Sequence, residues 1–339
     1  MDKPHTGPLL TLWNHHKAGA RQESSPRQHN ENSMPRCNML PPLWTLLGAG
    51  ALGGVFASLL TQSGQGVRLM VRDTQRSRLH PAIDFTALDG TAHLLAIPRC
   101  FASDAATTKR LLVMTKAGQV VEALRPLQGL LGREVPIVLL HNGMGIAERV
   151  AALFPDNPLL VGVTSHGAMR GGHYTFRHTG KGETWIGPFN EAGREHAQIA
   201  LDLAKALGQA EWDEQIPVRQ WQKLAINCMI NPLTALYRVK NGELSTPRFS
   251  DALTQLSVEL ADVMQAEGMA VTADELLRRA LTVAELTADN SSSMLQDREA
   301  GRSTEIEAIT GYLLARAEHH GIAVPVNRSL FEAISQKAG

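Results

Sequence analysis

The chain has 339 residues, 43% of them hydrophobic and 19% charged, and its 33 Lys and Arg residues balance 33 Asp and Glu. This length suits two domains with separate cores. The neutral balance argues against nucleic acid or an anionic membrane as partner, and no run approaches the roughly 20 apolar residues that span a bilayer. Three scattered cysteines without a C-x-x-C pair indicate no metal or redox motif. We expect a soluble, cytoplasmic protein that binds small molecules.

Residues 1–43 differ in composition from the rest of the chain. They are rich in His, Asn, Gln, Ser and Pro and show little periodicity, which predicts a flexible N-terminal extension. Leu9 to Trp13 is too short for the apolar region of a secretory signal, and no small-residue cleavage site follows it. A transit peptide is the alternative, although acidic residues are present and arginines are sparse. The folded chain is therefore expected to begin at Trp44.

From Trp44 onward, short aliphatic and β-branched runs alternate with amphipathic segments, which is typical of a parallel sheet covered by helices. Strands are expected near 44–48, 67–72, 93–97, 111–115, 136–140 and 159–164. Polar and apolar residues then alternate between Gly171 and Gly187, which predicts an antiparallel hairpin that closes the sheet. Helical periodicity returns at Glu195–Leu207.

No strand pattern follows Ile216, so the last part of the chain is predicted to be all-helical. The fold class is therefore α/β, with two domains after the extension. Residues 44–214 are expected to form a Rossmann-type domain that binds NADP. Residues 215–339 are expected to form a helical substrate domain.

The first predicted strand runs into G-A-G-A-L-G, which comprises Gly48, Ala49, Gly50, Ala51, Leu52 and Gly53. A strand before and a helix after is the context that the G-x-G-x-x-G motif requires. We expect Gly48 to permit the tight turn, Gly50 to let the backbone approach a pyrophosphate, and Gly53 to let the helix pack closely on the strand. The amides at the helix N-terminus would then bind the phosphates. A glycine-rich turn without a ligand is the alternative.

The end of the second strand bears on the choice of cofactor. An acidic residue there binds the ribose 2′-hydroxyl of NAD, whereas an arginine accommodates the 2′-phosphate of NADP. Arg72 and Asp73 are adjacent in the sequence; Arg72 indicates NADP, whereas Asp73 indicates NAD. We favour NADP, because Arg72 comes first and Arg76 and Arg78 follow; a one-residue error in the strand would reverse this choice. Solvated surface arginines are the alternative.

Two more loops follow predicted strands, at the sheet edge where open α/β sheets bind ligands. They are T-K-A at Thr115–Ala117 and H-N-G-M-G at His141–Gly145. Each by itself is compatible with an ordinary turn. Their shared position favours a role for both at the ligand site.

A later segment, Trp221–Leu233, reads W-Q-K-L-A-I-N-C-M-I-N-P-L. Because a helix has about 3.6 residues per turn, Lys223, Asn227 and Asn231 lie on one stripe. Burying an ammonium and two amides without partners costs several kcal/mol, so one interpretation is that a small substrate completes them. The other is a hydrogen-bonded network between core helices.

With these motifs in this order, the chain resembles the ketopantoate reductase (2-dehydropantoate 2-reductase) family, and it is similar to the enterobacterial form. Further matching segments are N-G-E-L (Asn241–Leu244), S-S-M-L-Q-D (Ser292–Asp297), T-E-I-E-A-I-T-G (Thr304–Gly311) and H-G-I-A-V-P (His320–Pro325). The resemblance extends from Trp44 nearly to the end of the chain and leaves out the N-terminal extension.

The resemblance implies an NADPH-dependent reduction of 2-dehydropantoate to (R)-pantoate, on the route to pantothenate and coenzyme A. It assigns the general acid to Lys223 and a motif glutamate to Glu305. The substrate-binding residues that it implies are Asn142, Asn227, Asn231, Asn241 and Ser293. It also adds Lys116, Asn142 and Glu305 to the glycine turn and Arg72 as cofactor-binding residues. Both a monomer and a homodimer are compatible with it.

The chemistry of ketone reduction gives these assignments a physical reason. Hydride transfer leaves negative charge on the carbonyl oxygen, so a proton donor or cation must lie within about 3 Å, and Lys223 can be both. Glu305 follows Ser303 and Thr304 at the start of a predicted helix, where capping that helix is its ordinary role. The alternatives are a partner for the Lys223 ammonium or a contact to the substrate hydroxyl.

The sequence also allows other interpretations of single residues and of the function. His141 is more readily a structural residue than an acid or base, and the other histidines lack metal-ligand spacing, so no metal is expected. Another dehydrogenase of the same two-domain build could act on a different 2-oxo acid or use NADH. A sensor that binds NADPH without catalysis is a further alternative, but the presence of Lys223 among other polar residues argues against it.

Overall fold

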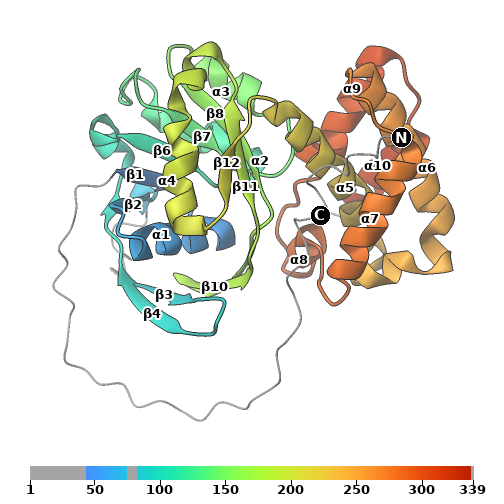
Figure 1. The fold of residues 1–339 in the computed structure, drawn as a ribbon, viewed down its shortest axis with the longest axis horizontal. Coiled ribbons are helices and arrows are strands. Elements are labelled where there is room, and N and C mark those ends of the chain that lie inside the picture. Colours follow the sequence, from blue (N-terminus) through green and yellow to red (C-terminus); the bar gives the residue numbers. More distant parts are fainter. Residues whose placement is uncertain (1–42, 75–81, 337–339) are drawn as a thin grey trace, which may run out of the picture.

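The computed structural model describes residues 43–74 and 82–336, which form an α/β part and a helical part (Figure 1). An eight-stranded sheet with the order β12-β11-β8-β7-β6-β1-β2-β5 forms the centre of the α/β part. Its strands are β1 (Trp44–Leu47), β2 (Val67–Met70), β5 (Arg99–Cys100), β6 (Arg110–Val113), β7 (Ile137–Leu139), β8 (Leu159–Thr164), β11 (Thr184–Pro188) and β12 (Ala210–Trp212). Neighbouring strands from β5 to β8 pair in parallel, and β11 is antiparallel to β8.

Helices cover both faces of this sheet, which is why β1 is buried at all four residues. The helices are α1 (Ala51–Gln62), α2 (Ala117–Leu124), α3 (Ala147–Leu153) and α4 (Gln198–Leu207), with short 3-10 turns at Ala102–Thr107, Arg125–Leu127 and Glu191–His196. Helices α1 and α4 pack on one face, through residues such as Phe56 and Leu203. Helices α2 and α3 pack on the other, through residues such as Leu124 and Val150.

A second, four-stranded sheet with the order β4-β3-β10-β9 lies against α1 (Figure 1). Its strands are β3 (Ala82–Thr86), β4 (Ala92–Ala96), β9 (Gly167–Gly172) and β10 (Thr175–Gly180). The approach to α1 is close, because a side chain at Gly54 would overlap the ring of Phe176 on β10. Helix α1 therefore lies between the two sheets.

This second sheet corrects two expectations. The strand expected at 93–97 exists as β4, but it pairs antiparallel with β3 outside the parallel sheet. Its residues are alternately exposed and half-buried, because only one of its faces packs on protein. The antiparallel hairpin expected between Gly171 and Gly187 is not formed, because the two strands of this segment, β10 and β11, do not pair with each other. Strand β10 pairs with β9 and β3 in the second sheet, whereas β11 continues the large sheet beside β8. Strands β3, β5, β9 and β12 have no counterpart among the expected strands.

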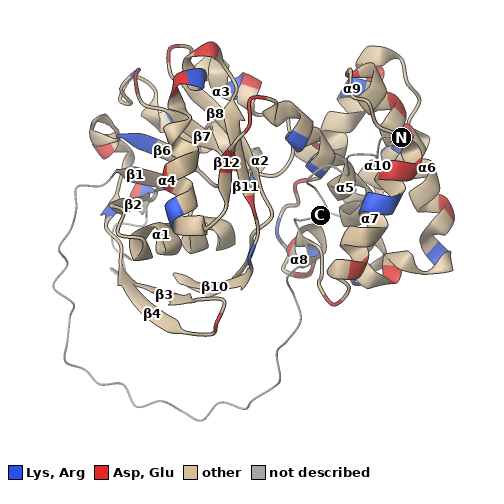
Figure 2. Ribbon diagram, viewed as in Figure 1, with Lys and Arg blue, Asp and Glu red and all other residues tan. Residues whose placement is uncertain are grey.

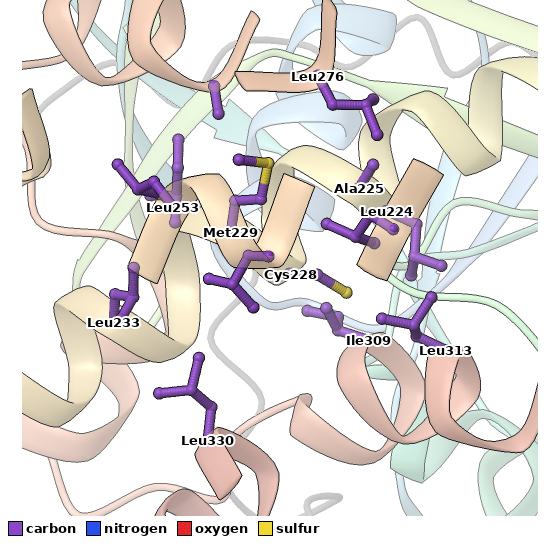
Figure 3. Packing of buried hydrophobic residues seen from close by; sticks show 14 of the residues in the cluster. Leu224, Ala225, Cys228, Met229, Leu233, Leu253, Leu276, Ile309, Leu313 and Leu330 are labelled. Carbon is purple, nitrogen blue, oxygen red and sulfur yellow. The ribbon is translucent and has the colours of Figure 1, made fainter. Parts of the chain in front are cut away.

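The helical part packs around the long helix α5 (Ile216–Tyr237). The other helices are α6 (Ser250–Ala266), α7 (Ala273–Leu286), α8 (Ser293–Glu299), α9 (Tyr312–His320) and α10 (Pro325–Ser335), with 3-10 turns at Asn241–Ser245 and Pro247–Phe249 and a π-helical turn at Glu307–Gly311. Figure 3 shows Cys228 and Met229 of α5 surrounded by leucines from the neighbouring helices. The prediction that only helices follow Ile216 is confirmed for the described residues.

Several expectations concern residues that lie outside the described part of the chain. These are the N-terminal extension up to residue 42, and Arg76 and Arg78. The division at residues 214 and 215 stays a prediction; β12 ends at Trp212 and α5 begins at Ile216. Among the described residues, no helix is both long and apolar enough to cross a membrane. Basic and acidic residues are interspersed over both parts in Figure 2.

Candidate active site

A cleft of about 3250 Å³ separates the carboxyl ends of the parallel strands from the helical part. The glycine turn after β1, the loops after β6 and β7, and one side of α5 all line it. The cleft therefore joins the predicted phosphate-binding turn to the predicted polar stripe, two features about 175 residues apart in the sequence.

The glycine turn has the geometry that the motif predicts. Gly48 has a φ of +112°, in the left-handed region that favours glycine, and a side chain there would stand 2.6 Å from the backbone nitrogen of Thr115. A side chain at Gly53 would overlap the carbonyl oxygen of Gly48, so helix α1 packs directly on the turn. A side chain at Gly50 would meet nothing within 4 Å. The backbone at Gly50 is thus open to the cleft, as a pyrophosphate site requires.

Other residues expected at the dinucleotide also face this cleft. Ala49, Ala51 and Leu52 line it within the turn, and the exposed Arg72 and Asp73 line it at the end of β2. The hydroxyl of Thr115 is buried, with no hydrogen-bond partner among the described residues. A polar atom left in this state at the edge of a cleft is suited to a polar ligand. The residues present therefore fit a bound dinucleotide.

Lys223 is held in the cleft by two hydrogen bonds to the α/β part. Its Nζ atom donates to Oδ1 of Asn142 at 2.8 Å and to the carbonyl oxygen of Thr164 at 2.9 Å. Burial lowers the pKa of this ammonium from 10.5 to about 8, and the negative charge of Glu305 acts in the opposite direction. A lysine with a pKa near neutrality is suited to proton transfer. The alternative interpretation of a hydrogen-bonded network therefore applies to Lys223 in one respect, since its ammonium has protein partners. These partners, however, lie in the α/β part and not on neighbouring core helices.

Glu305 does not use its carboxylate to cap its own helix, which corrects the ordinary role considered for it. Its Oε1 atom accepts a hydrogen bond of 3.0 Å from the backbone N–H of Ala117, at the start of α2. Its Oε2 atom accepts one of 2.9 Å from Nδ2 of Asn142. The carboxylate therefore caps a helix of the α/β part, where the helix dipole favours negative charge. It reaches Lys223 only through the amide of Asn142.

The other predicted polar residues also lie along the cleft. Asn227 and Asn231 follow Lys223 on the same side of α5, as their spacing predicts. Asn241 donates through Nδ2 to the hydroxyl of Thr287 at 2.8 Å, while its Oδ1 atom is buried without a partner among the described residues. Ser293 is exposed on the cleft wall, and its neighbour Ser292 provides the cap of α8.

Lys116 joins the two parts at the other side of the cleft. Its Nζ atom lies 2.6 Å from Oδ1 of Asp297 and donates to the carbonyl oxygen of Ser303 at 2.7 Å. Asp297 also accepts from Arg302. All the predicted site residues except Gly53, which packs against the turn, therefore line this one cleft, but their functional roles stay predictions.

Sequence reasoning missed two groups at this site, the carbonyl oxygen of Thr164 and the carboxylate of Asp297. Thr164 lies where a predicted strand ends, a position that itself indicates a ligand edge. Asp297 belongs to a quoted motif, but no spacing relates it to Lys116. His141 is half-buried, and burial lowers its pKa; its structural role stays a prediction. Within the described residues, no group of three or more His, Cys, Asp and Glu is placed to hold a metal.

Comparison with known proteins agrees with this geometry. Residues 44–191 match the family model "Ketopantoate reductase PanE/ApbA", and residues 215–338 match "Ketopantoate reductase PanE/ApbA C terminal". The chain belongs to the ketopantoate reductase family. This membership makes it an oxidoreductase with a dinucleotide-binding domain, and it confirms the resemblance stated from the motifs.

Curated relatives in this family cover nearly the whole described chain. The 2-dehydropantoate 2-reductase of Salmonella typhi is 39% identical over 293 residues, which are 86% of this chain and 94% of that protein. The enzyme of the same name from Archaeoglobus fulgidus is 32% identical over 85% of this chain and 95% of that protein.

Solved structures show the same fold at lower identity. A PanE/ApbA family ketopantoate reductase from Ralstonia eutropha matches with a TM-score of 0.76 and 24% identity, over 87% of this chain and 98% of that one. D-mandelate dehydrogenase in complex with NADH and anilino(oxo)acetate matches with a TM-score of 0.79 and 22% identity, with the same coverage. These likenesses confirm the α/β part followed by a helical part.

Proposed function

We propose that this family member reduces 2-dehydropantoate to (R)-pantoate with NADPH, and that Lys223 is the general acid. The observation that carries the proposal is the position of the Lys223 ammonium. It lies in the cleft that begins at the glycine turn, fixed between Asn142 and Thr164, with a pKa lowered to about 8. The identity to 2-dehydropantoate 2-reductases supports the choice of substrate.

The cofactor side of the site would use the residues that fit a dinucleotide. Gly48 to Gly53 would hold the pyrophosphate at the N-terminus of α1, and Arg72 would pair with a 2′-phosphate. A bound nicotinamide supplies the hydride for reduction of the C2 ketone. Because Arg72 and Asp73 both face the cleft, the preference for NADPH rests on Arg72 and on the family.

The substrate side would use groups that stabilise charge and hold the chain of the oxo acid. As negative charge grows on the ketone oxygen, the Lys223 ammonium stabilises that charge and then gives up a proton. Asn142 holds the ammonium and is itself held by Glu305, so the donor is oriented before substrate arrives. Asn227, Asn231, Asn241 and Ser293 would bind the carboxylate and hydroxyl of the substrate.

The direct test follows oxidation of NADPH by its absorbance in the presence of 2-dehydropantoate. We expect turnover with this pair, slower turnover with NADH, and little with pyruvate. Turnover with another 2-oxo acid and none with 2-dehydropantoate would assign a different substrate to the same site. Binding of NADPH without oxidation by any oxo acid would indicate a sensor and refute the proposal.

The assembly of the protein belongs with these proposals. A ketopantoate reductase from Staphylococcus aureus is described as dimeric. We propose a monomer or homodimer for this chain, which sedimentation velocity on the purified protein would distinguish.

A further inference from the structure

A π-helical turn begins two residues after Glu305, at Glu307–Gly311. Such turns are rare, and within helices they are frequent at functional sites. This one is buried at Ala308, Ile309 and Thr310. It is tied to the backbone of Glu305, whose carbonyl oxygen accepts hydrogen bonds from the amides of Ala308 and Ile309, both at 3.1 Å. The position of Glu305 therefore depends on where this turn is fixed.

The turn is fixed by the loop that carries Asn142. The backbone N–H of Met144 donates to the carbonyl oxygen of Ala308 at 2.9 Å, across the boundary between the two parts. Gly143 has a φ of +81°, and a side chain there would stand 2.6 Å from the carbonyl carbon of Ala308 and overlap its oxygen. Gly145 has a φ of +83°, and a side chain there would lie 2.8 Å from the ring of Tyr312. Glycine is thus required at both positions of this loop, because the helical part approaches its backbone too closely to leave room for a side chain.

At this contact, each of the two parts also packs one apolar side chain against the core of the other part. Ala308 belongs by sequence to the helical part, but it is buried within the core beneath α2 and α3. Met144 belongs to the α/β part, but it packs against the core of the helical part. Tyr312, which follows the turn, lies with its ring 5.6 Å from that of Trp221, two residues before Lys223 on α5. Each part therefore inserts one residue into the other.

We propose that this interlock, made by Gly143, Met144 and the π-helical turn Glu307–Gly311, is the positioning element that aligns Glu305 and Asn142 with Lys223. It acts through these residues and does not touch the reacting atoms. The interlock joins the segments that carry the two middle members, Glu305 and Asn142, of the chain of hydrogen bonds from Ala117 to Lys223. This inference deepens the proposed function and rests on it for its kinetic part.

The test compares Gly143→Ala with Gly129→Ala. Both glycines have a left-handed φ, but a side chain at Gly129 would meet nothing within 4 Å. The control therefore introduces the same backbone strain without pushing on Ala308. We expect Gly143→Ala to lower kcat by about 10- to 100-fold, as small displacements at an active site do. The alkaline limb of the pH profile of kcat/KM should also move. Gly129→Ala should change neither kcat nor this pH profile.

Hydrogen exchange provides a readout that does not depend on turnover. In Gly143→Ala the amides of Met144 and Ala117 should exchange at least about tenfold faster, because both donate to groups that the turn holds in place. Amides of β7 should keep their protection. If Gly143→Ala does not fold, Ala308→Gly removes the inserted methyl group without a clash and should give the same pattern, more weakly.

The outcomes separate the two proposals. A wild-type protein that reduces no oxo acid refutes the proposed function, and the exchange of Ala117 still tests the interlock. Unchanged exchange at Ala117 in the variant that folds would overturn the interlock. Equal kinetic effects of Gly143→Ala and Gly129→Ala would assign the loss to backbone strain and would overturn it as well.

Discussion

Lys223 and Glu305 are connected through one amide, because Asn142 accepts from the lysine ammonium through Oδ1 and donates to the glutamate carboxylate through Nδ2. The two charged residues come from the helical part, and the amide comes from the α/β part. The charged pair is therefore separated by a neutral group that fixes the orientation of both. This arrangement leads to predictions about rate, pH dependence and cofactor choice.

Lys223→Ala removes the proposed proton donor and should lower kcat by at least about 10²-fold, the lower bound of typical general-acid contributions. Affinity for NADPH should be retained, because the glycine turn is untouched. The matched control is Lys181→Ala, which removes another lysine from the same cleft. Steady-state kinetics and fluorescence titration measure both effects. A rate that stays at the wild-type value would remove Lys223 from the chemistry.

The pH dependence of kcat/KM should show a limb near the pKa of Lys223. The acid must be protonated to act, so activity is present at lower pH and lost as pH rises through about 8. The negative charge of Glu305 raises this pKa, so Glu305→Gln should move the limb to lower pH. Profiles of both proteins measured at constant ionic strength test this. A limb that moves upward would contradict the assignment.

Arg72→Ala should weaken NADPH binding far more than NADH binding. A charge-assisted hydrogen bond contributes about 1.5–3 kcal/mol, which corresponds to roughly 10- to 100-fold in affinity. Arg72→Lys keeps the positive charge and should lose less. The test is to measure the dissociation constants of NADPH and NADH for the wild type and both variants. An equal loss of affinity for the two dinucleotides would refute contact between Arg72 and the 2′-phosphate.

Gly50→Ala should separate binding from folding. The added methyl group meets no protein atom within 4 Å, so the thermal unfolding midpoint should be unchanged. Dinucleotide affinity should fall at least about tenfold, because the methyl group occupies the approach to the pyrophosphate. Gly53→Ala should instead destabilise the fold, since its methyl group overlaps the carbonyl oxygen of Gly48. Retained affinity in Gly50→Ala would place the pyrophosphate elsewhere.

A buried histidine pair should make the protein sensitive to acid. Nδ1 of His166 lies 3.0 Å from Nε2 of His178, and burial lowers the pKa of His166 from 6.5 to about 4. The unfolded chain therefore binds more protons between these values, so stability falls as pH drops from about 6.5 toward 4, by up to about 3 kcal/mol.

The matched variant for this pair is His166→Asn. Its amide can still donate to His178, but it does not titrate. Urea unfolding at pH 7 and at pH 5 should show a smaller loss of stability for the variant than for the wild type. The same loss in both proteins would show that the acid sensitivity arises elsewhere.

The sequence alone determined the features that depend on local spacing. G-x-G-x-x-G after an apolar run specifies a turn and a helix through backbone sterics, and residues four apart on a helix share a side. The positions of Gly48 to Gly53, and of Lys223, Asn227 and Asn231, therefore followed from periodicity. The order of the motifs then indicated the family.

Only the tertiary structure decided which groups meet across the cleft. No local pattern relates Glu305 to the amide of Ala117, Lys116 to Asp297, or Ala308 to Met144, because each pair is more than 150 residues apart and belongs to different parts of the chain. The placement of β4 and the β9–β10 hairpin in a second sheet likewise depends on packing against α1. Spacing along the chain reports the periodicity of single elements, whereas these contacts depend on how separate elements pack.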